Sequence, residues 1–294
     1  MRIAFFGLPL AALLLAADGH EVAWAAVCRK GALGTRRLRR LLGDRVTIVP
    51  ESTSAAVQLA VKAARPELVV SWFWTRRLPP PILALAPAVG VHPSLLPRHR
   101  GPDPTFWAID AGDRETGVTA HRLAEAYDTG AILAQRAVAI APEWNAWQLA
   151  RALDRPSLAL LREVVRAYAE GRPPPERAQD EALATSAPEP TEEELGLRWS
   201  WTAERVARRV RAAAPWPGAW TEIGERLVTL VRVRPTPDFP RVLAPGEAAV
   251  RADGVAVVRA GDAAIELLEG RDEDDAPLSA EALARVVAEA THAS

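Results

Sequence analysis

The chain has 294 residues, and its content of 49% hydrophobic and 25% charged residues excludes a disordered or fibrous protein and favours two globular domains. The single cysteine, Cys28, excludes an intrachain disulfide and a cysteine-based metal cluster. Because no apolar run reaches the roughly 18 residues that span a bilayer, we expect a cytoplasmic protein with no membrane partner and no bound metal.

Charge is distributed unevenly along the chain. Residues 1–190 carry 23 basic and 19 acidic side chains, whereas residues 191–294 carry 13 basic and 18 acidic ones. The second part is therefore a poor partner for a phosphate backbone. The first part contains a stretch without an acid, from Cys28 to Gly43, in which four of the five residues from 36 to 40 are arginines. This stretch is consistent with phosphate contacts and, since leucines interrupt the arginines, with a solvated amphipathic helix.

Short apolar runs alternate with helical patterns in the N-terminal half of the chain. This alternation is typical of a Rossmann-like α/β fold, in which a mostly parallel sheet carries helices on both faces. The expected strands are Arg2–Phe6, Glu21–Val27, Val46–Val49, Leu68–Trp72, Ala88–Val91, Thr116–Leu123 and Ile132–Ile140, and the expected helices are Leu10–Asp18, Ser54–Ala64, Pro104–Ala111 and Trp147–Glu170.

A proline-rich segment from Gly171 to Pro175 has the composition of a semi-rigid linker. We therefore expect an N-terminal domain over 1–171, a linker over 172–198 and a C-terminal domain over 199–294. The C-terminal domain begins with a helical pattern and continues with short alternating strands, which favour a small OB-like β-barrel. These elements are the helix Trp201–Ala213 and the strands Trp220–Glu222, Leu227–Val233, Ala248–Val250, Val255–Arg259 and Ala263–Leu268.

His92 and Asp128 are candidates for proton chemistry. His92 follows a predicted strand, and Asp128 lies 36 residues later in a loop beside Gly130. Ligands of open α/β sheets bind at the carboxyl ends of the strands, so both side chains can reach one cleft and act as an acid–base pair. The same spacing also fits two loop residues that take no part in catalysis.

Several short motifs surround these two residues. They are His92–Pro97, Arg100–Pro102, Glu115–Thr119 and Asp128–Gly130, and Trp199 and Arg211–Ala219 follow in the C-terminal half. In this order and spacing they resemble the formyltransferase family, whose members include methionyl-tRNA formyltransferases and the enzyme that formylates UDP-4-amino-4-deoxyarabinose. The resemblance covers nearly the whole chain.

The resemblance implies that a formyl unit passes from 10-formyltetrahydrofolate to an amine. It also implies that His92 polarises the formyl group and stabilises charge on its oxygen, while Asp128 raises the basicity of His92 or accepts a proton through water. The family's folate-binding positions correspond here to Ser94, Leu95, Leu96 and Pro97, and to backbone facing the pterin at Tyr127, Thr129 and Gly130. In the alternative interpretation, these leucines are core residues and the glycines serve only turn geometry.

One position departs from the family pattern. The family has an asparagine two residues before the histidine, where its amide donates to the formyl oxygen, and this chain has Gly90. Loss of one such donor typically lowers turnover about 100- to 1000-fold, or about 3–4 kcal/mol. Three interpretations of Gly90 are open. A water molecule or the side chain of His121 or His99 replaces the missing amide; the enzyme catalyses the transfer slowly; or the protein binds folate without catalysing a reaction. We expect activity to be retained, because His92, Asp128 and the folate-facing segment persist.

The favoured acceptor is a small amine such as an amino-sugar nucleotide, because Glu115–Arg122 and Gly130–Gln135 resemble the amino-sugar enzyme. Initiator methionyl-tRNA is the alternative acceptor, which the acidic balance of residues 191–294 weakens. A 10-formyltetrahydrofolate hydrolase and a non-catalytic folate-binding relative are also compatible with these motifs. The sequence carries no signal for the oligomeric state.

Overall fold

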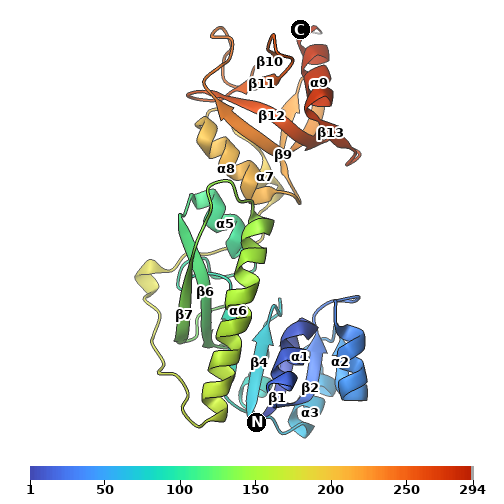
Figure 1. Cartoon of the computed structure of the whole chain (residues 1–294), viewed down its shortest axis with the longest axis vertical. Helices are drawn as coiled ribbons and strands as arrows, with labels where there is room; N and C mark the ends of the chain where they lie inside the picture. Colours follow the sequence, from blue (N-terminus) through green and yellow to red (C-terminus); the bar gives the residue numbers. More distant parts are fainter. Residues whose placement is uncertain (293–294) are drawn as a thin grey trace. The chain divides into compact units, whose positions relative to one another are not determined.

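The computed structural model describes residues 1–292, which divide into two compact units that interleave along the chain (Figure 1). No helix within these residues combines the length and the apolarity that a bilayer crossing needs. The contiguous boundaries 1–171, 172–198 and 199–294 stay a prediction. Unit 1 consists of Met1–Pro104, Glu115–Ala139 and Ala152–Pro188, and unit 2 consists of Thr105–Arg114, Ile140–Arg151 and the chain from Glu189 onward.

Unit 1 is built on a seven-stranded sheet with the strand order β3-β2-β1-β4-β5-β6-β7. The first five of these strands run parallel, β6 is antiparallel to β5, and β7 is antiparallel to β6. The mostly parallel sheet expected from the sequence is therefore confirmed. The strands are β1 (Arg2–Gly7), β2 (Glu21–Val27), β3 (Val46–Ile48), β4 (Leu68–Trp72), β5 (Ala88–His92), β6 (Glu115–Arg122) and β7 (Ile132–Ala139).

Helices cover both faces of this sheet. Phe6 and Val69 pack with Val61 of α3 and Ile82 of α4 in one apolar cluster. On the opposite face, the indole of Trp72 donates a hydrogen bond of 2.7 Å to Ser157 of α6, since successive side chains of a strand point to opposite faces. The helices with residues in unit 1 include α1 (Pro9–Ala17), α2 (Thr35–Leu42), α3 (Ala55–Ala63), α4 (Pro80–Leu83) and most of α6 (Ala146–Ala169), with short 3₁₀ turns at Gly43–Arg45 and Glu181–Leu183, whereas α5 (Pro104–Ala111) lies almost wholly in unit 2.

The basic stretch after β2 forms helix α2. Thr35, Leu38 and Leu42 are buried along one side of it, and its four arginines are exposed. The amphipathic-helix interpretation is therefore confirmed. Whether the exposed arginines contact phosphates stays a separate question.

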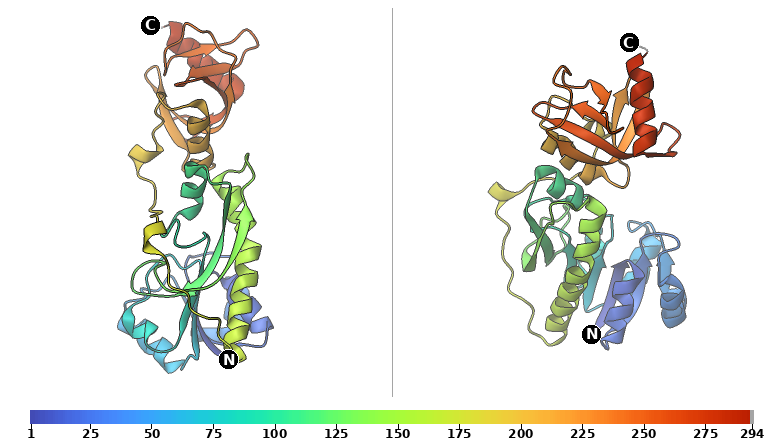
Figure 2. Two further views of the ribbon diagram at one scale, coloured as in Figure 1. Left: turned by 90° about the vertical axis from the view of Figure 1, so that its left-hand side faces the viewer. Right: turned by 45° about the horizontal axis from the view of Figure 1, so that its top comes forward.

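Unit 2 contains a curled antiparallel sheet of six strands in the order β10-β11-β12-β9-β8, with β13 paired to β12. It corresponds to the predicted barrel. The C-terminal helix α9, which was not expected, packs against this sheet (Figure 2) and buries Leu283, Val286 and Val287. The strands are β8 (Ala219–Ile223), β9 (Arg226–Thr236), β10 (Ala248–Val250), β11 (Ala256–Arg259), β12 (Ala264–Arg271) and β13 (Pro277–Ser279), and the helices are α7 (Glu192–Leu195), α8 (Ala203–Ala213) and α9 (Ala280–His292).

A buried carboxylate joins α5 to α8 within unit 2. Asp110 is 4% exposed and accepts hydrogen bonds from Arg205 and from the equally buried Arg209, whose Nε lies 2.7 Å from Oδ1. Burial alone would raise the pKa of Asp110, but the hydrogen bonds from Arg209 and Arg205 outweigh burial and lower it. The carboxylate is therefore ionised and paired, which stabilises the contact between the two helices.

We expect Asp110→Asn to lower the free energy of unfolding by about 3–5 kcal/mol, because it leaves the charge of Arg209 buried and uncompensated. Denaturant titration followed by circular dichroism measures this loss. Glu163→Gln breaks the exposed pair with Arg136 and serves as the control, with an expected change below about 1 kcal/mol. Equal effects of the two substitutions would contradict this account.

Candidate active site

The two residues singled out for proton chemistry lie next to each other in unit 1. His92 is the last residue of β5, and Asp128 lies in the loop between β6 and β7. The distance from His92 Nδ1 to Asp128 Oδ2 is 3.4 Å, and both side chains are largely buried, with 7% and 16% exposed. The predicted convergence of this pair is therefore present, and its catalytic role stays a proposal.

The loop around Asp128 is held in a constrained conformation. Asp128 has a φ of 56°, in the left-handed region, and its Oδ2 accepts a hydrogen bond of 3.0 Å from the backbone N–H of Gly101. Gly130 lies so close to β6 that a Cβ there would come within 1.8 Å of the carbonyl oxygen of Arg122. The loop therefore requires glycine at position 130, which accounts for part of the Asp-Thr-Gly motif without any ligand.

A second histidine, His121 of β6, also faces Asp128. Its Nε2 lies 3.5 Å from Asp128 Oδ1, and its Nδ1 lies 2.8 Å from the carbonyl oxygen of Arg122. Burial lowers the pKa of His121, and the charge of Asp128 only partly opposes this effect. His121 is therefore neutral near pH 7, with its proton on Nδ1 donated to the carbonyl and a lone pair on Nε2.

His92 has a corresponding arrangement. Its Nε2 donates a hydrogen bond of 2.7 Å to the carbonyl oxygen of His99, so its Nδ1 is directed at Asp128. A proton that enters this cluster is therefore held between a carboxylate oxygen of Asp128 and an imidazole nitrogen, which is the arrangement of a general base. In the part of the chain that the structure describes, no group of three or more histidine, cysteine, aspartate or glutamate side chains is placed to hold a metal ion.

Two cavities in unit 1 meet at Tyr127, beside Asp128. The first, of about 70 Å³, includes Asp128 and His121 in its wall, and the second, of about 420 Å³, is lined on one side by Arg100 and Gly101. His92 lines neither of them. Asp128 is therefore accessible from the smaller cavity, and the larger one lies beside it at Tyr127. Other lining residues are Ser71, Trp74, Arg76, Arg77, Leu78, Leu123, Ala124 and Ala126 in the first, and Pro102, Ala184, Thr185, Ser186 and Pro188 in the second.

The segment expected to bind folate is mostly buried. Ser94 is fully buried and donates a hydrogen bond of 2.6 Å to the carbonyl oxygen of Arg98, and Leu96 is 3% exposed. Leu95 and Pro97 are half-buried. The core interpretation therefore fits Leu96, whose backbone N–H and carbonyl oxygen are also hydrogen-bonded, to Thr119 and Gln135.

The other predicted loop residues are more accessible. Tyr127 is 45% exposed, and its hydroxyl donates to the carbonyl oxygen of Thr75 at 3.3 Å. Thr129 donates to the carbonyl oxygen of Ala126 at 3.3 Å. Of the predicted ligand residues, Tyr127 is therefore the one whose side chain is most available to a ligand.

Gly90 lies in the middle of β5, paired with Ser71 of β4 and His121 of β6. Its φ lies outside the left-handed region, so its backbone admits any residue. A Cβ at position 90 would meet the Cδ2 methyl of Leu123 at 2.8 Å. The space where the family's asparagine side chain begins is therefore taken up here by a leucine methyl.

Gln179 is a site residue that sequence analysis missed. Its Nε2 donates to the carbonyl oxygens of Asp128 and Gly130 at 2.6 and 2.7 Å, and its Oε1 accepts from Nε of Arg100 at 3.0 Å. The segment that carries it also pairs Ser186 with Arg100. The segment predicted as a linker thus connects the loop of Arg100 with the loop of Asp128 through Gln179. The sequence of this segment has no periodicity that would have predicted these contacts.

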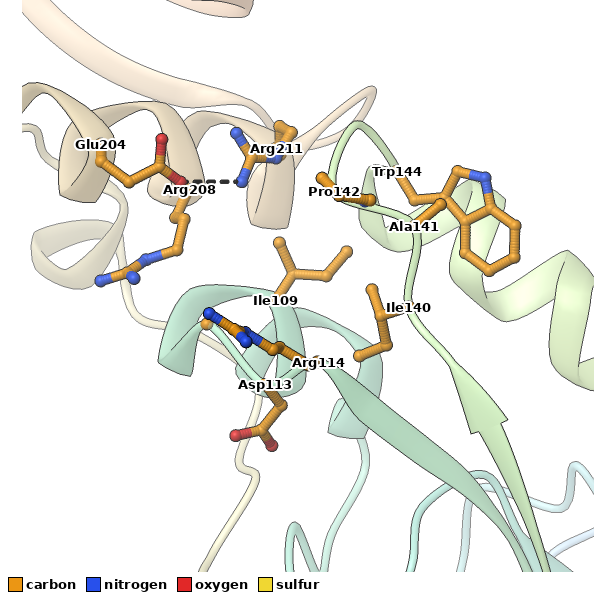
Figure 3. Close-up of a pocket in the computed structure, with 11 residues that line it drawn as sticks. Ile109, Asp113, Arg114, Ile140, Ala141, Pro142, Trp144, Glu204, Arg208 and Arg211 are labelled. Atoms are coloured by element: carbon orange, nitrogen blue, oxygen red, sulfur yellow. Dashed lines mark hydrogen bonds and ion pairs between the residues drawn. The ribbon is translucent and has the colours of Figure 1, made fainter.

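The largest cavity described here, of about 610 Å³, lies wholly in unit 2 and is lined by none of the residues predicted from the sequence (Figure 3). Arg208 and Arg211 contribute to it, and Arg211 pairs with Glu204 at 3.3 Å. Its wall contains Ile109 and Ile140 but no histidine. Volume alone does not identify a catalytic site.

Comparison with known proteins gives a match to the formyl transferase family over residues 45–165 and to the formyl transferase C-terminal domain over residues 190–287. The chain is 37% identical over 297 residues to a methionyl-tRNA formyltransferase of Anaeromyxobacter dehalogenans, covering 94% of the chain and 95% of the relative. It is 35% identical to one of Chloroflexus aurantiacus, covering 96% of both.

Solved structures share the fold. HypX from Aquifex aeolicus, in complex with tetrahydrofolic acid, matches with a TM-score of 0.69 at 21% identity over 98% of this chain and 47% of HypX, so the chain spans about half of that protein. An N-formyltransferase from Helicobacter canadensis, in complex with folinic acid and dTDP-3-aminofucose, matches with a TM-score of 0.65 at 14% identity over 91% of this chain and 98% of that one.

We expect Gln179→Glu to loosen the loop of Asp128, because a carboxylate cannot donate to the two carbonyl oxygens that the amide now satisfies. Amide hydrogen exchange at Thr129, Gly130 and Gly101 should become at least about tenfold faster, which corresponds to about 1.4 kcal/mol of local stability. Gln58→Glu, which removes a similar side-chain bond to a backbone carbonyl on α3, is the control. Unchanged exchange in the Gln179 variant would show that the loop holds its conformation alone.

Proposed function

The chain belongs to the formyltransferase family, and we propose that it transfers the formyl group of 10-formyltetrahydrofolate to a primary amine. The observation that carries the proposal is the carboxylate of Asp128, which faces His92 and His121 at 3.4 and 3.5 Å where two cavities meet. The larger cavity can admit part of a substrate, and the smaller one, which Asp128 lines, has room only for a small group such as the reacting formyl unit.

The reaction needs a base and a stabiliser of negative charge. The amine nitrogen attacks the formyl carbon with its lone pair, and the carbonyl oxygen takes up negative charge in the tetrahedral intermediate. The attacking nitrogen then loses one proton, N10 of the folate gains one, and the bond between N10 and the formyl carbon breaks as the carbonyl re-forms. Asp128 is proposed to accept the proton from the amine, directly or through water, and to return it to N10.

His92 is proposed to stabilise the charge on the formyl oxygen. Its Nε2 is held by the carbonyl oxygen of His99 at 2.7 Å, whereas its Nδ1 lies at the longer distance of 3.4 Å from Asp128. Because Nε2 already donates to that carbonyl oxygen, Nδ1 is proposed to donate to the formyl oxygen in the state in which both ring nitrogens carry a proton. The folate is proposed to lie against the backbone of 94–97 and of 127–130, with Tyr127 beside it.

We propose methionyl-tRNA as the first acceptor to test. Relatives with that name match 94–96% of the chain at 35–37% identity, whereas the likeness to the Helicobacter canadensis N-formyltransferase, at 14% identity, is one of fold. The exposed arginines of α2 supply positive charge that suits a phosphate backbone. This choice differs from the small amine that the sequence motifs favour.

An amino-sugar nucleotide is the second candidate acceptor. It is supported by the resemblance of Glu115–Arg122 and Gly130–Gln135 to the amino-sugar enzyme and by the acidic balance of residues 191–294. A small acceptor needs few phosphate contacts, so the charge of the C-terminal part does not oppose it.

The acceptor is tested by incubating the protein with 10-formyltetrahydrofolate and either methionyl-tRNA or a UDP- or dTDP-amino sugar. We expect tetrahydrofolate to form in proportion to formylated methionyl-tRNA. The affinity for this tRNA should fall steeply with salt, by about 1000-fold between 50 and 200 mM if about six phosphates are contacted. Turnover only with the amino sugar would replace the first acceptor by the second, and formate release without any acceptor would indicate a hydrolase.

The assignment of the two main residues is tested by His92→Ala and Asp128→Asn. Each should lower kcat about 100- to 10,000-fold, the range for losing an acid–base or charge-stabilising group, while circular dichroism and the melting temperature stay near those of the wild type. His20→Ala and Asp44→Asn replace the same residue types at the start of β2 and before β3 and serve as controls. Wild-type rates in both site variants would refute the assignment.

A further inference from the structure

The asparagine that family members place two residues before the histidine is Gly90 here, and the formyl oxygen needs a substitute donor. We propose that the hydroxyl of Ser71 donates this hydrogen bond and stabilises the negative charge of the tetrahedral intermediate. The inference rests on the proposed formyl transfer. Ser71 would then be a catalytic residue on β4, whereas the family's asparagine donor lies on the strand that corresponds to β5.

Strand register places Ser71 beside the missing side chain. Ser71 of β4 is paired with Gly90 of β5, and Gly90 is paired with His121 of β6. Paired residues lie on the same face of a sheet, and so do residues two positions apart on one strand. Ser71, position 90, His92 and His121 therefore occupy one patch of one face, on the side covered by α4.

The distances support the substitution. A Cβ at position 90 would lie 3.6 Å from the Cβ of Ser71, so the Ser71 hydroxyl, one bond further out, reaches the region that an asparagine amide would enter. Ser71 is 9% exposed and lines the same cavity as His121 and Asp128. Among residues 1–292, no group forms a hydrogen bond with this hydroxyl, so its proton is free to be given to a ligand.

Other donors around this cavity are less suited. His121 has donated its Nδ1 proton to the carbonyl oxygen of Arg122, and its lowered pKa leaves Nε2 without a hydrogen. The hydroxyl of Tyr127 is directed to the carbonyl oxygen of Thr75. The indole nitrogen of Trp74 has no hydrogen-bond partner in the described chain, but the nitrogen itself is fully buried.

The experiment compares kcat and KM for 10-formyltetrahydrofolate in the full-length wild type, Ser71→Ala and Ser157→Ala. We expect Ser71→Ala to lower kcat about 100- to 1000-fold with little change in KM, because an oxyanion donor acts mainly in the transition state. Ser157→Ala, which removes a buried hydroxyl on the other face of the sheet, is the matched control and should retain kcat.

A rescue variant separates a catalytic from a structural role. Gly90→Asn combined with Leu123→Ala restores the family's amide and removes the leucine methyl from its path. Placed in the Ser71→Ala background, this pair should recover kcat at least about tenfold. A loss that arose from disturbed packing of β4 would not be recovered by a new amide on β5.

The outcomes distinguish this inference from the proposed function. Full kcat in Ser71→Ala, or an equal loss in Ser157→Ala, overturns the role of Ser71 while formyl transfer stands. A wild type that turns over only after Gly90→Asn with Leu123→Ala also overturns it, since the hydroxyl then fails to replace the amide. A chain that transfers no formyl group in either form overturns the proposed function itself.

Discussion

The geometry of the site depends on how the carboxylate of Asp128 is held. The carboxylate accepts the N–H of Gly101 at 3.0 Å and faces two imidazoles, while the backbone carbonyl of the same residue accepts from Gln179 at 2.6 Å. The residue adopts a left-handed φ of 56°, a conformation that persists only where surrounding contacts support it. The loops of His92 and Asp128 and the segment of Gln179 therefore form one hydrogen-bonded assembly, and a change in any of them moves the carboxylate.

Much of this arrangement could be predicted from the sequence. The apolar runs of β1 and β4 are buried almost completely, so their composition alone identified them as strands. His92 and Asp128 were recognisable because a histidine at a strand end and an aspartate next to Gly130 are local features. The same reasoning should have found α9, whose buried Leu283, Val286 and Val287 have helical spacing.

The rest could not be predicted, because it depends on neighbours in space. Ser71 lies beside Gly90 only because β4 and β5 are adjacent, and His121 joins them because β6 reverses direction. Periodicity fixes which face of its own strand a residue occupies but not which strand comes next. Gln179 is a harder case, since it lies in a segment without periodicity and acts by hydrogen bonding to carbonyl oxygens that any residue could supply.

The side chains at positions 90 and 123 compete for the same space. A side chain at position 90 needs the space that a methyl group of Leu123 now fills. With glycine at position 90, this methyl group occupies the space of the family's asparagine side chain. Burial of one methyl contributes about 0.8 kcal/mol, whereas an oxyanion donor contributes about 3–4 kcal/mol to the transition state. The packing gain stabilises the folded chain and leaves the transition state without its donor. The proposed substitute comes from the neighbouring strand, where the hydroxyl of Ser71 lines the same cavity as Asp128 and His121.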